Sequence, residues 1–349
     1  MGQGKKLMDQ NAEILKKAIS GSLKIIEQDR EKEIISRRFG LEGSRETLEQ
    51  IGEMLSITRE RVRQLEKAIL VRLQIAAEDG EIPELAAAEK LIVRNLIEMG
   101  RVAKLTDLAD KIYGRKASAS ECTGIIFIAT FAKNLTVVEE NDKYHVAVGI
   151  AEYGDSRVIR GRVDEIVKVI KENKQPMTID ELDEKLDYEH PNYIKAMASL
   201  SKLLASLHGR WGLNKWPSVN PKNIRDKIYV VLQAKKEPMH FSEIAKEIKE
   251  SNFKRKNVTV QAIHNELIKD SRFVLIGRGI YALNTWGYKK GTIMDTIVSI
   301  MEKSGKPLTR EEIVREVLRV RKVKETTVLL NLQNKKVFRK VDKNLYTLA

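Results

Sequence analysis

The sequence has few of the residues that build metal sites and disulfides. Its 349 residues include one cysteine, Cys122, which excludes an internal disulfide and a four-thiolate metal site. No two of the five histidines are closer than 18 positions, so metal-ligand pairs at helical spacing are absent. The longest apolar run, IIFIATFA at 125–132, is far shorter than the roughly 20 residues of a membrane-spanning helix. The N-terminus has no apolar signal core, and these absences together predict a cytoplasmic protein with no metal and no membrane partner.

Motifs that carry catalytic chemistry are also missing. The sequence has no Walker loop, no GxGxxG after a strand, no HExxH and no paired cysteines. Cys122 lies in the apolar stretch SECTGIIFI without a nearby histidine, which is typical of a buried structural thiol rather than a nucleophile. We therefore expect a protein that is not an enzyme, with no cofactor and no small-molecule substrate.

The charge balance is strongly basic. Lys and Arg number 63 against 49 Asp and Glu, a formal net charge of +14. Such an excess favours nucleic acid or another anionic partner. A solvated surface rich in Lys and Glu would give the same composition, so charge alone leaves that alternative open.

A helix-turn-helix pattern occupies residues 29–80. A helix over 29–38 is expected to end near Gly40. Thr47-Leu48-Glu49-Gln50 fits a capping box that opens the next helix, and Thr58 can cap the one after it. The expected inward stripe of that last helix is Val62, Leu65, Ile69 and Leu73.

The outer face of the same helix is polar and basic. Arginine can bond a guanine edge through two hydrogen bonds, glutamine an adenine, and glutamate a cytosine amino group. All three types are present, which predicts a helix that enters the major groove of duplex DNA. A surface helix with ordinary charge pairs would show the same pattern. The residues concerned are Arg59, Glu60, Arg61, Arg63, Gln64 and Lys67.

The segments FGL, TLEQIG and TRERVRQLEKAIL closely resemble region 4 of sigma-70 family factors, the helix-turn-helix that reads the promoter −35 element. The resemblance covers residues 30–73. It implies that Arg59 and Glu60 contact bases and that Thr47 touches a phosphate at a helix N-terminus. It also implies docking on the flap of the β subunit of core RNA polymerase. The DNA-facing set that it implies is Thr58, Arg59, Glu60, Arg63 and Gln64.

The chain departs from a complete sigma factor in the residues before this match. They contain no Phe, Tyr or Trp, and the first aromatic residue is Phe39. Aromatic rings are needed to stack on the bases of melted DNA. We therefore expect a domain that recognises duplex DNA, without a module that melts the promoter.

A long-period repeat follows residue 85. KQPMTIDELDEKL, KEPMHFSEIAKEI and GKPLTREEIVREV each place a proline and a cap-like residue before an amphipathic helix, and GRVAKLTDLADKI is a weaker copy. Each copy has a helix before it, and a third helix and an alternating, aromatic-closed stretch after it. This is the winged-helix plan, with hairpin turns expected at Gly277–Gly279 and Asp342–Asn344. We predict a mainly α chain with small β-hairpin wings: an N-terminal helix or arm at 1–28, the helix-turn-helix at 29–80, and winged helices at 85–150, 157–217, 219–287 and 290–349.

The third of these units resembles the HARE-HTH domain, chiefly through its ending FVLIGRGIYAL. That family includes the N-terminal domain of the delta subunit of Gram-positive RNA polymerase and domains of restriction and chromatin proteins. The resemblance implies either DNA contact or docking on a partner, and both readings stay open.

Basic clusters mark the third and fourth units. Lys335, Lys336, Arg339 and Lys340 follow the third helix of the fourth unit. Neutralisation of DNA phosphates would explain such clusters, and a solvated face is the alternative. The DNA-binding candidates here are Lys254, Arg255, Lys256 and Arg278 in the third unit, and Arg321, Lys322 and Lys324 in the fourth.

The sequence as a whole favours a transcription regulator associated with bacterial RNA polymerase. Its expected partners are double-stranded DNA, read at a −35-like sequence, and the polymerase flap. One alternative is a polymerase-docking scaffold, similar to the delta subunit, with little sequence-specific DNA binding. A more distant alternative is a DNA-sensing accessory of a restriction or modification system.

Overall fold

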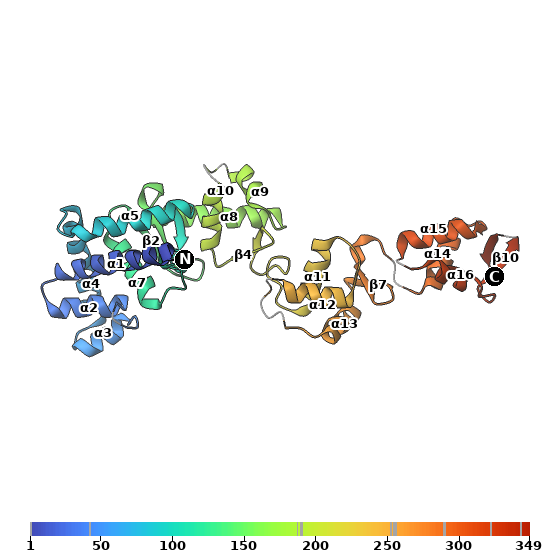
Figure 1. Ribbon diagram of the computed structural model, residues 1–349, viewed down its shortest axis with the longest axis horizontal. Coiled ribbons are helices and arrows are strands. Elements are labelled where there is room, and N and C mark those ends of the chain that lie inside the picture. The colour runs from blue at the N-terminus through green and yellow to red at the C-terminus, as the bar shows by residue number, and fades with distance from the viewer. Residues whose placement is uncertain are drawn as a thin grey trace. The chain divides into compact units, whose positions relative to one another are not determined.

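The computed structural model describes residues 2–41, 43–186, 188, 191–251, 253, 257–288, 291–321, 323–342 and 344–349. The chain forms two compact units, Met1–Lys215 and Trp216–Ala349, which are described separately (Figure 1). Within the described ranges, no helix is both long and apolar enough to cross a membrane.

The N-terminal unit begins with a long helix, α1 (Gly2–Lys24), that packs against the helices of the first winged helix. Leu15 and Ala18 on this helix are buried in the core of the unit. The side-chain amide of Asn11 donates to the carbonyl oxygen of Ile112 at 3.1 Å. The helix therefore contributes Leu15 and Ala18 to the hydrophobic core.

The helix-turn-helix follows as α2 (Asp29–Phe39), α3 (Leu48–Leu55) and α4 (Arg59–Glu78). Gly40 ends α2 in the left-handed conformation, with φ of 60°, as expected for a helix C-cap. The side chains of Ile34, Ile51 and Val62 are fully buried where the three helices meet. One small apolar cluster thus fixes the mutual orientation of α2, α3 and α4.

The first winged helix contributes a three-stranded antiparallel sheet of order β1-β3-β2. It shares one hydrophobic core with α1 and with the helix-turn-helix. The ring of Phe39 from α2 lies 5.2 Å from that of Phe127, which in turn lies 5.1 Å from Phe131. The elements are α5 (Pro83–Glu98), β1 (Val102–Lys104), α6 (Leu105–Tyr113), α7 (Ala119–Phe131), β2 (Leu135–Val138), β3 (Ala147–Ile150) and the 3-10 turn η1 (Ala151–Tyr153).

The second winged helix packs on the first. A Cβ added to Gly100, whose φ is +94°, would lie 2.4 Å from the carbonyl oxygen of Asn192, so glycine permits this close approach. An isolated bridge between Met177 and Trp211 takes the place of a first strand. The elements are α8 (Ser156–Asn173), α9 (Ile179–Leu186), α10 (Pro191–Leu200), β4 (Leu204–Leu207) and β5 (Arg210–Leu213).

The C-terminal unit holds two further winged helices, each with a three-stranded sheet, of orders β6-β8-β7 and β10-β11-β9. The third consists of α11 (Ile224–Lys235), β6 (Met239–His240), α12 (Phe241–Glu250), α13 (Val260–Lys269), β7 (Phe273–Gly277), β8 (Ile280–Leu283) and η2 (Asn284–Trp286). The fourth consists of α14 (Ile293–Ser304), β9 (Leu308–Thr309), α15 (Arg310–Val320), α16 (Glu325–Leu332), β10 (Phe338–Asp342) and β11 (Leu345–Leu348).

The predicted fold class, mainly helical with small antiparallel hairpins, is confirmed. The predicted wing turn at Gly277–Gly279 joins β7 to β8, and Gly279 has a φ of +72°. The turn predicted at Asp342–Asn344 contains Lys343, which lies outside the described residues. The short strands β1, β6 and β9, which precede the second helix of three winged helices, were not predicted.

Candidate nucleic-acid interface

Both helices of the helix-turn-helix have capped N-termini. The backbone N–H of Thr47 donates to Gln50 Oε1 at 2.8 Å, and the N–H of Gln50 donates to Thr47 Oγ1 at 3.3 Å. This capping box opens α3, as predicted. At the start of α4, the N–H of Arg61 donates to Thr58 Oγ1 at 3.1 Å. A helix N-terminus is a setting that favours anions such as phosphates.

The turn between α3 and α4 depends on a glycine inside α3. The N–H of Ile57 donates to the carbonyl oxygen of Gly52 at 2.9 Å, and Ser56 adopts the left-handed conformation with φ of 51°. A Cβ at Gly52 would lie 2.7 Å from the carbonyl oxygen of Ile57. Sequence reasoning assigned Gly52 no role. The signal was present, because a glycine in a helix interior costs about 1 kcal/mol and needs a packing reason.

The two faces of α4 are divided as predicted. Val62, Ile69 and Leu73 are fully buried, and Leu65 is half-buried. The predicted outward residues are all exposed, and so are both capping threonines. The exposed set is Thr47, Thr58, Arg59, Glu60, Arg61, Arg63, Gln64 and Lys67.

Glu60 and Arg63 form an ion pair on the exposed face. Arg63 Nε donates to Glu60 Oε2 at 2.8 Å, and Arg63 Nη2 donates to Glu60 Oε1 at 2.6 Å. Gln64 Nε2 lies 3.4 Å from the same Oε1. The hydrogen bonds from Arg63 lower the pKa of Glu60 below its ordinary value, and they raise the pKa of Arg63. Arg59, by contrast, makes a longer contact of 3.9 Å with Glu49.

Ion pairs and hydrogen bonds behind this face hold α2 against the other two helices. Arg30 Nη2 donates to the carbonyl oxygen of Leu55 at 2.6 Å. Arg38 Nε donates to Glu66 Oε1 at 3.1 Å and so joins α2 to α4. The sequence did not single out these residues, because their partners lie up to 28 positions away.

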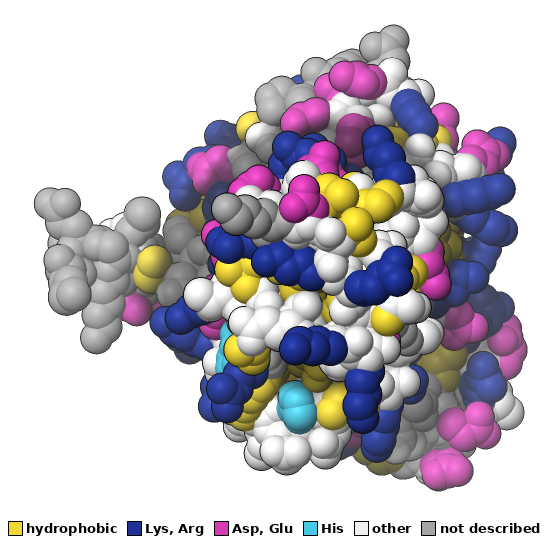
Figure 2. Space-filling model, turned by 90° about the vertical axis from the view of Figure 1, so that its right-hand side faces the viewer, with side chains coloured by type: hydrophobic (Ala, Val, Ile, Leu, Met, Phe, Trp, Pro, Cys, Tyr) yellow, Lys and Arg dark blue, Asp and Glu magenta, His cyan; other side chains and the backbone are white. Residues whose placement is uncertain are grey.

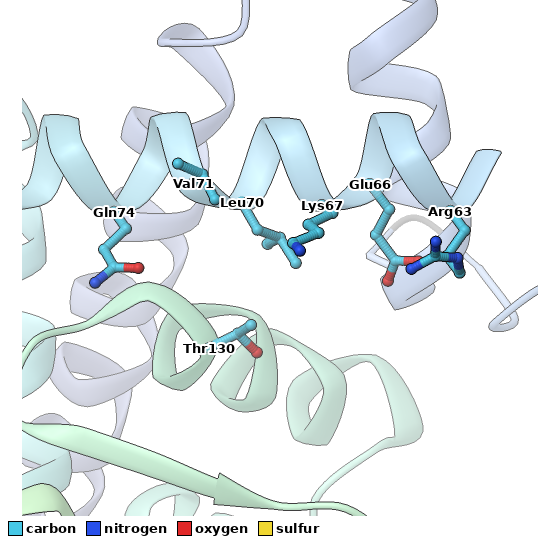
Figure 3. Close-up of a pocket in the computed structure, with 7 residues that line it drawn as sticks. All are labelled: Arg63, Glu66, Lys67, Leu70, Val71, Gln74 and Thr130. Carbon is cyan, nitrogen blue, oxygen red and sulfur yellow. The ribbon is translucent and has the colours of Figure 1, made fainter. Parts of the chain in front are cut away.

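An open groove of about 290 Å³ runs along α4 from Arg63 and Lys67 of the predicted DNA-facing set to Gln74. Figure 3 shows Thr130 of α7 on the opposite side of this groove from α4. Val71 in the lining of this groove is 47% exposed, and Ile75, one turn further along α4 and outside the lining, is 53% exposed. The α4 residues that line the groove are Arg63, Glu66, Lys67, Leu70, Val71 and Gln74.

The structure places the predicted DNA-binding residues of the C-terminal unit in different settings. Arg278 is exposed in the turn between β7 and β8. Lys324 is the exposed N-cap residue of α16. Their contact with DNA stays a prediction. Lys254, Arg255, Lys256 and Lys322 lie outside the described residues.

The prediction that Arg321 contacts DNA is wrong. Its side chain is only 5% exposed. Its Nε donates to Thr296 Oγ1 at 3.1 Å, its Nη1 to the carbonyl oxygen of Leu275 at 3.2 Å, and its Nη2 to the carbonyl oxygen of Gly291. Burial lowers the pKa of this guanidinium. Arg321 therefore joins the third winged helix to the fourth rather than facing a ligand.

Cys122 lies on α7 and is half-buried. Burial, with a smaller contribution from Asp110 and Glu121, raises the pKa of its thiol. Among the described residues, no group of three or more His, Cys, Asp or Glu side chains is arranged to hold a metal ion.

Comparison with known families agrees with the geometry in two segments. Residues 28–74 match the family described as sigma-70, region 4. Residues 224–286 match the HARE-HTH family, a helix-turn-helix domain whose description names ASXL and restriction endonuclease proteins. These modules indicate DNA binding and a role related to transcription.

Individual relatives match over one short segment. The chain is 39% identical over 61 residues to RNA polymerase sigma factor sigB of Arabidopsis thaliana, which is 17% of this chain and 11% of the relative. It is 39% identical over 57 residues to RNA polymerase sigma factor SigA4 of Synechococcus elongatus, 16% of this chain and 18% of the relative. The matches thus span less than a fifth of either relative. The chain contains a sigma-70 region 4 domain near its N-terminus and a HARE-HTH domain over residues 224–286.

Proposed function

We propose that the protein is a transcription regulator that associates with bacterial RNA polymerase and reads a −35-like duplex sequence through α4. The observation that carries the proposal is the concentration of Arg59, Glu60, Arg63 and Gln64, all exposed, in the first two turns of a helix packed as the second helix of a helix-turn-helix. In that motif, the N-terminal residues of the second helix contact base edges. No catalytic step is part of this proposal.

The chemistry of the face suits mixed base pairs. An arginine fork matches the O6 and N7 atoms of guanine, a carboxylate accepts from the cytosine amino group, and a glutamine amide matches adenine. The hydroxyl of Thr47 and the exposed N-terminus of α3 are suited to a backbone phosphate. Phosphate contacts of this kind set the register of the protein on the duplex and leave the choice of sequence to α4.

The test is fluorescence anisotropy with the full chain, a −35-containing duplex and a scrambled duplex of the same composition. We expect at least a tenfold preference for the −35 duplex, about 1.4 kcal/mol. Arg59→Ala should abolish this preference, because it removes a base contact. Arg94→Ala is the matched control, since Arg94 is an exposed arginine on α5, outside the helix-turn-helix. Equal affinity of the wild type for both duplexes would contradict the proposal.

A second candidate function is docking on RNA polymerase without sequence-specific reading. The groove beside α4 favours it, because Val71 exposes apolar surface next to Leu70 in its lining. The proposed occupant is the flap of the polymerase β subunit. Val71→Ser should weaken binding of the isolated flap and, because it adds no charge, leave DNA affinity unchanged. Flap binding by the wild type with no preference between the two duplexes would favour this candidate over the first.

A further inference from the structure

A second basic surface lies on the fourth winged helix, at the C-terminal end of its third helix, α16. A groove of about 640 Å³ opens between the end of α16 and the wing formed by β10 and β11. Lys335, Arg339 and Lys340 line it together with Leu332, Gln333, Phe338, Tyr346 and Ala349. We call these eight residues the wing groove. Figure 2 looks onto the end of the chain that includes this winged helix, and Lys and Arg side chains lie across the middle of the face that it shows.

The backbone that carries the cations of the wing groove is fixed by a hydrogen-bonded turn and by strand pairing. After α16, the N–H groups of Val337 and Phe338 both donate to the carbonyl oxygen of Asn334, at 3.1 and 3.0 Å. Phe338 is buried in the core of the winged helix and anchors the start of β10. Arg339 then pairs with Thr347 of β11 and Lys340 with Tyr346. The tight turn and the strand register therefore fix the positions from which the three cationic side chains project.

These cations are also not neutralised by the protein. Lys335, Arg339 and Lys340 are exposed, and within the described part of the chain no carboxylate lies within 4.0 Å of their charged nitrogens. Arg319 on α15 of the same winged helix is different, because it pairs with Glu316 at 2.8 Å. Like charges gathered around a hollow without counter-charges raise the local positive potential and attract an anion.

The third helix of this winged helix offers little to a DNA base. The exposed side chains of α16 include Glu325, Thr326 and Leu330, and Leu330 is 68% exposed. Glu325 and Leu330 give a phosphate no donor, which leaves the Thr326 hydroxyl as the donor of this set. Cations on a wing and a turn, rather than on a helix that enters the major groove, are placed for the phosphate backbone rather than for base edges.

The aromatic residues of the groove argue against a single strand. Single-stranded nucleic acid binds where bases can stack on exposed rings. Phe338 is buried, and Tyr346 is half-buried between strands. We propose that the wing groove binds the phosphate backbone of duplex DNA without reading its sequence. Its role would be to hold DNA near the chain and to raise the effective concentration at any sequence-reading surface. The inference does not depend on base reading by α4.

The test measures the affinity of the full chain for a fluorescein-labelled duplex of scrambled sequence at several salt concentrations. The groove variant is Lys335→Gln, Arg339→Gln and Lys340→Gln together. The matched control is Lys303→Gln, Lys306→Gln and Arg315→Gln, which removes the same charge from exposed positions of the same winged helix that do not line the groove. Circular dichroism and thermal melting check that both variants are folded.

The groove variant should lower the slope of log affinity against log salt by about 2 to 3, because each phosphate contact on duplex DNA contributes about 0.9. The control should leave the slope close to that of the wild type. Equal losses in both variants would mean that net charge alone attracts DNA, and no loss in the groove variant would mean that the groove is not occupied; either result overturns the proposal. A loss seen only with a single-stranded probe would assign the groove to single strands and overturn it too. The tenfold −35 preference tested above should survive in the groove variant.

Discussion

Glu60 and Arg63 are bound to each other by two hydrogen bonds, of 2.6 and 2.8 Å, on the exposed face of α4. Both side chains are well exposed, so the pair contributes little to stability. A duplex in contact with α4 could therefore open the pair at small cost and replace each partner with a base. In the free protein the ion pair fixes the conformations of the Glu60 and Arg63 side chains on the first two turns of α4.

Glu60→Ala should have opposite effects on affinity and on specificity. Binding to the scrambled duplex should strengthen, because a negative charge is removed and Arg63 is released to a phosphate. The preference for the −35 duplex should fall by about tenfold or more, because one base contact is lost. Anisotropy titrations of both duplexes measure the two effects. Glu53→Ala removes the same charge from an exposed position of α3 and is expected to keep the full preference. An unchanged preference in Glu60→Ala would mean that Glu60 reads no base.

Gly52→Ala should destabilise the N-terminal unit. The added Cβ would lie 2.7 Å from the carbonyl oxygen of Ile57, so the turn between α3 and α4 must shift. Overpacking of this kind costs about 1–3 kcal/mol. Urea unfolding followed by circular dichroism measures the loss. Gly161→Ala on α8 is the matched control, since a Cβ there meets nothing within 4 Å. It should instead stabilise by about 0.5–1 kcal/mol. If the two variants had the same stability, close packing at Gly52 would not be the reason for its glycine.

Cys122 should react slowly with thiol reagents at neutral pH. Burial of the thiol disfavours the thiolate and raises its pKa above the ordinary 9.0, so the reactive form is scarce until the pH passes that value. The rate of iodoacetamide alkylation, measured between pH 7 and 10, should therefore stay low near pH 7 and rise only at the alkaline end of this range. An exposed reference thiol is supplied by Ser44→Cys in a Cys122→Ser background. Equal rates at pH 7 would show that the Cys122 thiolate is not disfavoured.

The sequence predicted those parts of the structure that are specified locally. Thr47, Thr58 and the stripe through Val62 and Ile69 were assigned correctly, because caps and helical periodicity act within a few residues. The winged-helix plan was recognised because its helices and hairpins recur in one order. The strands β1, β6 and β9 were missed since each has only two or three residues, too few to show alternation.

Features that depend on distant partners could not be predicted in this way. Arg321 lies in a run of cations that is typical of a solvated or DNA-facing surface. Its guanidinium can be buried because it donates to the carbonyl oxygens of Leu275 and Gly291, which lie 46 and 30 positions earlier in the sequence. The contact between the rings of Phe39 and Phe127 likewise could not be predicted from local sequence pattern.

Arg321→Met tests the corrected role of this arginine. Methionine keeps much of the volume but removes the hydrogen bonds that the buried guanidinium donates to the part-buried carbonyl oxygens of Leu275 and Gly291, and a hydrogen bond to a charged group contributes about 1.5–3 kcal/mol. Urea unfolding followed by tryptophan fluorescence should show this loss. Arg319→Met is the control, because it removes one exposed ion pair with Glu316 and should cost at most about 1 kcal/mol. The salt dependence of binding to the scrambled duplex should be the same in both variants. A lower salt slope in Arg321→Met without any loss of stability would return Arg321 to the DNA-binding surface, since only a phosphate contact changes the slope and spares the fold.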